Sequence, residues 1–241
     1  MSAIAIRNLS KKYGELTAVD SLNLSIEEGE LFALLGLNGA GKTTTIKMLS
    51  CLIRPSGGDA VLLGDSVREK PRAVKQKVNV SPQEIAVAPN LTVMENLELM
   101  AGIYGQDGKT AKQSARDLSL RFSLDGILGK KAKTLSGGMQ RRLSIAMALI
   151  SSPQILFLDE PTLGLDVLAR RELWASIKEL KSRVTILLTT HYLEEVEALS
   201  DRIGVMAKGR LTAVGTVEEL KGQTGTASLE DAFVSLSGGV V

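Results

Sequence analysis

Three short clusters of residues could act on a phosphorylated ligand, and the first is a glycine-rich loop. Residues 36–43 read Gly-Leu-Asn-Gly-Ala-Gly-Lys-Thr, which is the spacing of the phosphate loop G-x-x-x-x-G-K-[ST]. The glycines let backbone N–H groups point inward around anionic oxygens, and the helix that follows adds its positive end. The loop therefore predicts a nucleoside triphosphate, with Lys42 toward the outer phosphates and the Thr43 hydroxyl toward Mg²⁺. A small-molecule kinase or a GTPase would share this loop.

The second cluster is a pair of acids at the end of an apolar run. Residues 155–158 are Ile-Leu-Phe-Leu, and Asp159 and Glu160 follow. A buried strand delivers its last residues to the edge of a parallel sheet, beside the phosphate loop. Asp159 can then hold Mg²⁺, directly or through water, and Glu160, on the opposite face, can accept a proton from an attacking water. The pair favours hydrolysis over simple phosphoryl transfer.

The third cluster, residues 135–140, reads Leu-Ser-Gly-Gly-Met-Gln just before a helical segment. A serine hydroxyl and two glycines with free N–H groups form a second anion-binding helix start. One chain thus has two such starts and one acid pair. We expect the second start to serve a nucleotide held by another copy, in a head-to-tail dimer with two composite sites.

Composition narrows the class of protein. The chain has 241 residues, a formal charge of +2 and 3% aromatic residues. The near balance of charge argues against a nucleic-acid partner. The single cysteine, Cys51, and the single histidine, His191, exclude a Cys/His zinc site within one chain. The longest apolar run, residues 145–150, is far shorter than a membrane span of about 20 residues, so no crossing of the membrane is expected.

The elements that must position these residues alternate between strands and helices. Alternation and short apolar runs predict strands at residues 3–9, 16–26, 31–35, 155–158, 184–188 and 203–206. Helical periodicity and capping boxes predict helices at residues 43–51, 92–104, 109–122, 138–150, 167–180 and 192–199. We also expect residues 60–63 to pair with 78–81, and 211–214 with 203–206. The pattern predicts an α/β fold with a helical insertion at about residues 84–150.

Residues 135–140 resemble the signature of the ATP-binding cassette (ABC) ATPases, and the resemblance covers nearly the whole chain. Tyr13 resembles the aromatic residue that stacks on adenine, and Gln83 matches the Q-loop glutamine. Residues 164–166 resemble the D-loop, and His191 resembles the switch histidine that touches the γ-phosphate. These motifs fall in the order that the family has. Leucine stands at position 37, where proline is common, and Leu-Gly precedes the D-loop leucine where some relatives have Ser-Ala.

The resemblance implies a single nucleotide-binding domain with a P-loop NTPase core, ATP and Mg²⁺. The core would be a mixed sheet flanked by helices, with an N-terminal antiparallel part, over residues 1–83 and 151–220. A helical subdomain would span 84–150, and a short tail 221–241. The implied catalytic residues are Glu160, His191, Lys42 and Gln83, and the implied metal ligands are Thr43, Gln83 and Asp159. The implied nucleotide contacts are Tyr13, Gly36, Asn38, Gly39, Ala40, Gly41, Lys42, Thr43, Thr44, Ser136, Gly137, Gly138, Gln140 and Asp166.

The implied function is ATP hydrolysis in a head-to-tail homodimer, coupled to substrate movement by a membrane permease on a separate chain. The protein would lie in the cytoplasm, at the cytoplasmic face of the membrane. Residues 135–142, 189–195 and 228–233 resemble the exporter group linked to efflux of drugs, lipids, polysaccharides or sodium. An importer ATPase and a soluble cassette ATPase acting on nucleic acid or ribosomes are the alternatives.

Overall fold

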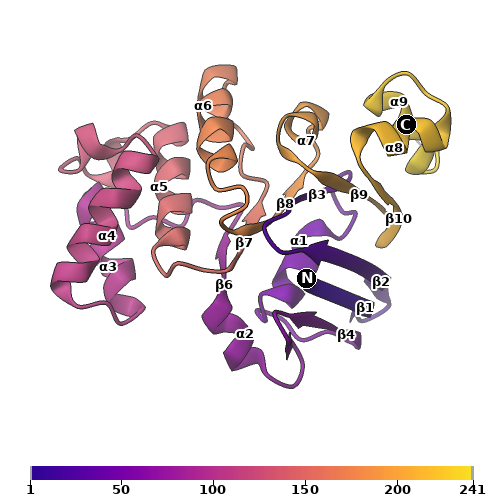
Figure 1. Ribbon diagram of the computed structural model, residues 1–241, viewed down its shortest axis with the longest axis horizontal. Coiled ribbons are helices and arrows are strands. Elements are labelled where there is room, and N and C mark those ends of the chain that lie inside the picture. Colours follow the sequence, from indigo (N-terminus) through magenta and orange to yellow (C-terminus); the bar gives the residue numbers. More distant parts are fainter. Residues whose placement is uncertain (1, 240–241) are drawn as a thin grey trace.

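Two β-sheets organise the chain in the computed structural model, which describes residues 2–239 (Figure 1). The smaller sheet is antiparallel, in the order β2-β1-β4-β5. Its strands are β1 (Ser2–Tyr13), β2 (Leu16–Glu27), β4 (Gly57–Leu62) and β5 (Asp65–Ser66). This sheet is the expected N-terminal antiparallel part.

The larger sheet has the order β10-β9-β3-β8-β7-β6 and is parallel except for the β9–β10 hairpin. Its strands are β3 (Leu31–Leu35), β6 (Val78–Ser81), β7 (Ile155–Asp159), β8 (Thr185–Thr190), β9 (Arg202–Ala207) and β10 (Arg210–Gly215). Every residue of β3, β7 and β8 is buried, as expected for parallel strands covered on both faces. The carboxyl ends of these strands meet at one edge.

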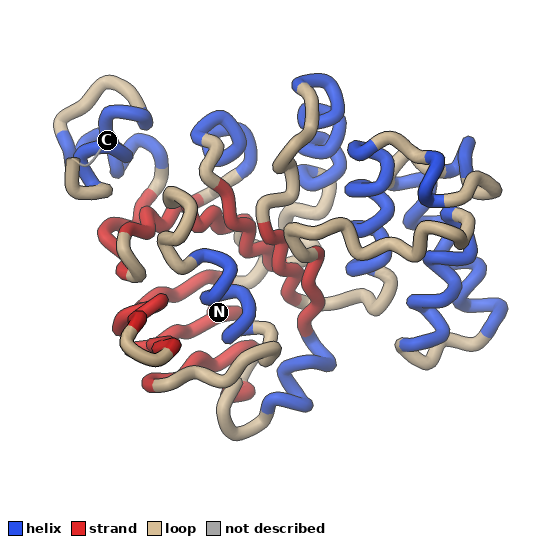
Figure 2. Tube along the Cα trace, turned by 180° about the vertical axis from the view of Figure 1, so that it is seen from behind, coloured by secondary structure: helices blue, strands red, loops and turns tan. Residues whose placement is uncertain are grey.

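Helices cover the larger sheet and extend beyond it. They are α1 (Lys42–Leu49), α2 (Pro71–Lys77), α3 (Val93–Ile103), α4 (Gly108–Arg121), α5 (Gly137–Leu149), α6 (Val167–Lys178), α7 (Leu193–Leu199), α8 (Val217–Thr224) and α9 (Leu229–Leu236). Helices α3, α4 and α5 pack against one another as a group at one end of the molecule. Figure 2 shows from behind that the larger sheet lies between this group and the C-terminal helices, with the smaller sheet below it. The α/β fold with an inserted helical part is confirmed.

Alternation along β3 divides the core into two. Phe32 and Leu34 join a cluster with residues of the antiparallel sheet and α1. Leu31, Ala33 and Leu35 join a second cluster with helices α3 to α7. Since successive side chains of a strand point to opposite faces, one short apolar strand supports both clusters.

One expected strand pairing is wrong. Residues 60–63 do not pair with 78–81: β4 pairs with β1, and β6 pairs in parallel with β7. Helix α2, opened by Pro71 at its first turn, separates β4 from β6 and carries the chain to the other sheet. Both strands were identified, but alternation within a strand carries no information about its partner.

The C-terminal region, expected as a short tail, contains two helices, α8 and α9. Helix α8 crosses the boundary expected at residue 220, and α9 is capped by the Ser228 hydroxyl, which accepts a hydrogen bond from the Asp231 N–H. Residues 240–241 of the expected tail lie outside the described residues. Within residues 2–239, no helix combines the length and apolar character that a membrane crossing requires.

Candidate active site

The phosphate loop connects β3 to α1 and leaves the start of that helix uncapped. Gly41 is the N-cap residue, with a φ of 103°, and no side chain bonds to the first helical N–H groups. A Cβ at Gly41 would lie 2.5 Å from the Ala18 carbonyl oxygen, so only glycine fits there. The N–H groups at the start of α1 are therefore available to an anion.

Glu160 lies between the two predicted cationic groups. Lys42 Nζ is 3.2 Å from Glu160 Oε1, with both side chains buried, and it also donates a hydrogen bond to the Gly36 carbonyl at 2.7 Å. His191 Nδ1 is 2.7 Å from Glu160 Oε2, although the angle is not that of a hydrogen bond. Glu160 is thus in contact with two of the other three predicted catalytic residues.

The backbone at Glu160 is unusual. Its φ of 49° is left-handed, which is costly for a residue with a long side chain. Its N–H donates to the carbonyl and the hydroxyl of Thr189 on the neighbouring strand, each at 3.1 Å. These bonds hold the turn just after β7, where the carboxylate leaves the sheet and enters the site.

Two of the predicted metal ligands are adjacent. The Thr43 hydroxyl donates a hydrogen bond to Asp159 Oδ1 at 3.0 Å, and the Thr189 hydroxyl donates to the same oxygen at 2.6 Å. A hydroxyl and a carboxylate oxygen are the hard ligands that Mg²⁺ takes in nucleotide sites. The donor set on the chain therefore fits this ion.

A cavity of about 450 Å³ gathers most of the predicted nucleotide contacts, and this volume suits a ligand of nucleotide size. Eleven predicted residues line it: Tyr13, Asn38, Gly39, Ala40, Gly41, Lys42, Thr43, Thr44, Gln83, Glu160 and His191. Leu16, Ala18 and Leu163 also line it and were not predicted. Leu16 and Tyr13 are exposed, at facing ends of β1 and β2. Their place around the tight turn at Gly14 is the signal that could have identified Leu16.

The predicted residues of the signature and the D-loop do not line this cavity. The Ser136 hydroxyl accepts a hydrogen bond from the Met139 N–H and caps α5. The Gln140 amide donates to the Ala132 and Leu135 carbonyls.

Asp166 caps α6 by accepting from the Ala169 N–H at 2.9 Å. Gly137 and Gly138 form the first residues of α5, and Gly138 packs so closely on Ala169 that an added Cβ would be 2.9 Å from the Ala169 Cβ.

Arg141, which sequence reasoning missed, ties the signature helix to Gln83. It is buried, and its guanidinium donates hydrogen bonds to the Pro82 and Gln83 carbonyls. Burial lowers the pKa of this guanidinium below its usual range. No periodicity marks this contact in the sequence, because it joins residues almost sixty positions apart.

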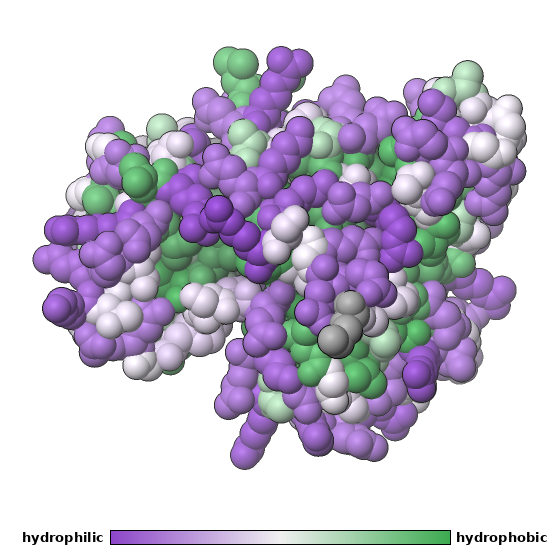
Figure 3. Space-filling view, viewed as in Figure 1, coloured by the Kyte–Doolittle hydropathy of each residue, from purple (hydrophilic) through white to green (hydrophobic). Residues whose placement is uncertain are grey.

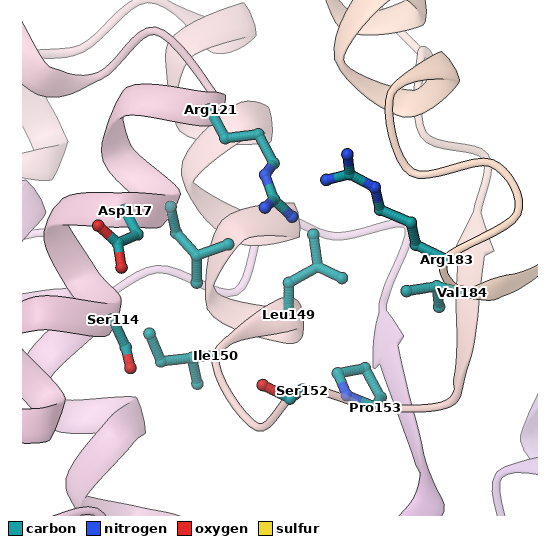
Figure 4. Close-up of a pocket in the computed structure, with 10 residues that line it drawn as sticks. Ser114, Asp117, Arg121, Leu149, Ile150, Ser152, Pro153, Arg183 and Val184 are labelled. Carbon is teal, nitrogen blue, oxygen red and sulfur yellow. The ribbon is translucent and has the colours of Figure 1, made fainter.

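A second cavity, of about 330 Å³, lies at the opposite edge of the larger sheet, before β7 and β8. Arg121 of α4 and Arg183 point toward one another across it, above Leu149 and Ile150 (Figure 4). None of the predicted site residues lines it. Of these two cavities, only the one at the carboxyl edge is lined by predicted site residues.

Comparisons with known proteins agree with this geometry. The family model described as ABC transporter matches residues 19–163. The daunorubicin/doxorubicin resistance ATP-binding protein DrrA of Streptomyces peucetius is 42% identical over 93% of this chain and 68% of that protein. The probable multidrug ABC transporter ATP-binding protein YbhF of Escherichia coli is 38% identical over 98% of this chain. The chain spans 42% of the length of YbhF.

Solved structures agree as well. An ATP-binding subunit of an ABC transporter has a TM-score of 0.86 and 31% identity, covering 98% of this chain and 99% of that chain. A dimeric ATP-binding cassette in a post-hydrolysis state, bound to ADP and Pi, has a TM-score of 0.79 and 26% identity, over 89% of this chain and 98% of that one. Since the family model matches more than half of the residues, this chain belongs to the ATP-binding proteins of the ABC transporter family.

Proposed function

We propose that this chain hydrolyses ATP as one half of a head-to-tail homodimer and drives a membrane permease, in the direction of export. The contact of Glu160 with both Lys42 and His191, beside an uncapped helix start, carries the proposal. A base and two groups that can bear positive charge would then surround one phosphate site.

ATP would lie along the cavity, with adenine against Tyr13 and the phosphates against residues 36–44. Lys42 is held by Glu160 and by loop carbonyls, which are the groups that the γ-phosphate would replace as its partners. Glu160, released from Lys42, accepts a proton from the attacking water. His191 and Lys42 then stabilise the charge that develops on the γ-phosphoryl group.

Thr43, Asp159 and Gln83 would hold Mg²⁺. When bound, the ion neutralises charge on the outer phosphate oxygens. The Thr43–Asp159 hydrogen bond and the position of Gln83 on the cavity wall support this assignment. The Thr189 hydroxyl keeps the Asp159 carboxylate oriented toward Thr43.

The second copy would complete each site. Ser136 and Gly137 are exposed, and together with Gly138, Gln140 and Asp166 they lie outside the cavity of their own chain. They would therefore contact the nucleotide of the partner. A solved cassette that is 26% identical to this chain is dimeric and bound to ADP and Pi, which supports a dimer.

A permease on another chain is the proposed membrane partner. Figure 3 shows the molecule hollowed between the α3–α5 group and the rest of the chain, with hydrophobic side chains inside the hollow. Arg141 fixes Gln83 to α5, so a change at the γ-phosphate would reach the helical group. DrrA and YbhF, named for drug resistance and multidrug transport, favour export over import. The chain would then lie at the cytoplasmic face of the membrane.

The test combines turnover with recruitment. We expect the purified chain to hydrolyse ATP, to dimerise in ATP-dependent fashion by analytical ultracentrifugation, and to sediment with membranes only when its permease is co-expressed. ATPase activity stimulated by RNA or ribosomes, without membrane recruitment, would favour the soluble alternative. The net charge of +2 speaks against that outcome.

A further inference from the structure

A buried acid on α7 lies outside the cavity and has no part in the proposed ATP hydrolysis. Glu195, on α7, is 0% exposed. The Trp174 indole N–H, on α6, donates a hydrogen bond to its Oε1 at 3.1 Å. Its other oxygen, Oε2, is buried without a hydrogen-bond partner. An unpaired buried acceptor is costly, so this arrangement calls for an explanation.

Burial favours the neutral form of Glu195. Burial raises the pKa of the carboxyl, against the smaller opposing effects of Thr190, Trp174, Thr162 and Arg170. The Thr162 hydroxyl is itself buried and unpaired. A neutral carboxyl carries a proton that it can donate to a hydroxyl, which an ionised one cannot.

Three segments that carry the proposed active-site residues meet at this carboxyl. Thr162 lies two residues after Glu160, at the entry to the D-loop. Thr190 directly precedes His191 at the end of β8. Trp174 belongs to α6, the helix that Asp166 caps. One side chain thus connects the base, the switch histidine and the D-loop.

Helix α6 extends the connection to the signature. Gly138, in the first turn of α5, packs against Ala169 of α6 without room for a side chain. A shift of α6 must therefore move the start of α5. The path from Glu195 to the signature runs through Trp174, α6 and this contact.

We propose that Glu195 is a positioning residue for ATP hydrolysis: it fixes His191 relative to the D-loop and couples both to the signature helix through Trp174. The inference rests on the proposed function. Glu195 does not line the cavity. Its loss should impair turnover more than nucleotide binding.

The test compares Glu195→Ala with Glu195→Gln, which keeps an acceptor for Trp174 and supplies a donor. Because a misplacement of about 1 Å costs up to about a hundredfold, we expect kcat to fall about tenfold in Glu195→Ala, with the KM for ATP within about twofold. Glu195→Gln should retain at least about half of kcat, since its amide replaces both hydrogen-bonding functions. Glu197→Ala, an exposed site on the same helix, is the matched control.

Trp174 provides a second readout because it is the only tryptophan. Its fluorescence should respond to ATP in the wild type and in Glu195→Gln, and lose that response in Glu195→Ala. If Glu195→Ala does not fold, Trp174→Phe removes the indole donor alone and should lower kcat without changing KM.

Three outcomes would overturn the inference. They are wild-type kcat in folded Glu195→Ala, equal loss in Glu195→Gln, and a fall in ATP affinity that matches the fall in turnover. Failure of the proposed function looks different, because the wild-type chain itself would then lack ATPase activity.

Discussion

Two helix starts in this chain share an anion-binding composition but differ in how their N–H groups are used. At α1 the N-cap is Gly41, and no side chain bonds to the free N–H groups. At α5 the N-cap is Ser136, whose own hydroxyl accepts the Met139 N–H at 3.3 Å. The first start borders a cavity with Lys42, whereas Gly137 at the second has open space around it.

The difference indicates separate roles for the starts of α1 and α5. The start of α1 is stable only because the fold around it holds the glycine loop, and it leaves donors for phosphate. The start of α5 is satisfied locally and needs no ligand to fold, so it can remain exposed until a partner arrives. In the proposed dimer, the start of α1 would therefore bind the nucleotide, and the start of α5 in the second copy would complete the site.

The largest effect should come from Glu160→Gln, at the first of these sites. Removing the base should lower kcat by about 10²- to 10⁴-fold, the usual contribution of general base catalysis. ATP binding should persist, since the uncapped start of α1 and Lys42 are unchanged. Steady-state ATPase assays and equilibrium nucleotide binding measure both quantities. Undiminished turnover would contradict the assignment of Glu160.

A substitution at the start of α5 tests the second helix start. Ser136→Arg should lower ATPase activity about tenfold or more by displacing the partner's nucleotide, because small misplacements at the reacting centre are costly. Nucleotide affinity of the monomer should change less than about twofold. Gln113→Arg, at an exposed site on α4, adds the same charge as a control. A large loss of monomer affinity would place Ser136 in the cavity of its own chain and remove the contrast.

A smaller effect is expected at the adenine end of the first site. Tyr13→Ala should weaken ATP binding about five- to tenfold, since one aromatic stack contributes about 1 kcal/mol or more. The kcat at saturating ATP should remain unchanged, because Tyr13 is remote from Glu160. Tyr104→Ala, another exposed tyrosine, controls for loss of aromatic surface. Equal loss of affinity in both variants would contradict stacking on Tyr13.

Local patterns predicted the elements, and the contacts between them were harder to infer. The apolar runs of β3, β7 and β8 and the capping box at Thr92 are visible within a few residues, and all are present. The partners of β4 and β6 depend on packing against distant strands. The Arg141 contact with Gln83 and the Trp174 contact with Glu195 join separate elements, so no spacing rule indicates them.

The smallest predicted effect concerns Glu195, which contacts α6 behind the start of α5, and it appears in the free energy of unfolding. Burial raises the pKa of Glu195 above the ordinary 4.5 of the unfolded chain. The folded protein thus keeps a proton that the unfolded chain loses, and stability falls as pH rises from the unfolded pKa to the folded pKa. Glu195→Gln lacks this proton. In urea unfolding, the free energy of unfolding of Glu195→Gln should therefore rise relative to that of the wild type by about 1.4 kcal/mol per pH unit within that interval.

If the difference in free energy of unfolding between the wild type and Glu195→Gln stays constant with pH, Glu195 is ionised in the folded protein. Trp174 and the neighbouring hydroxyls would then be donors to a buried anion, and the link through α6 would depend on charge. Glu197→Gln, which alters an exposed carboxyl on the same helix, should show almost no such pH dependence. Any pH dependence of stability that is specific to Glu195 therefore reports the proton at the junction of α6 and α7, between Glu160 and the start of α5.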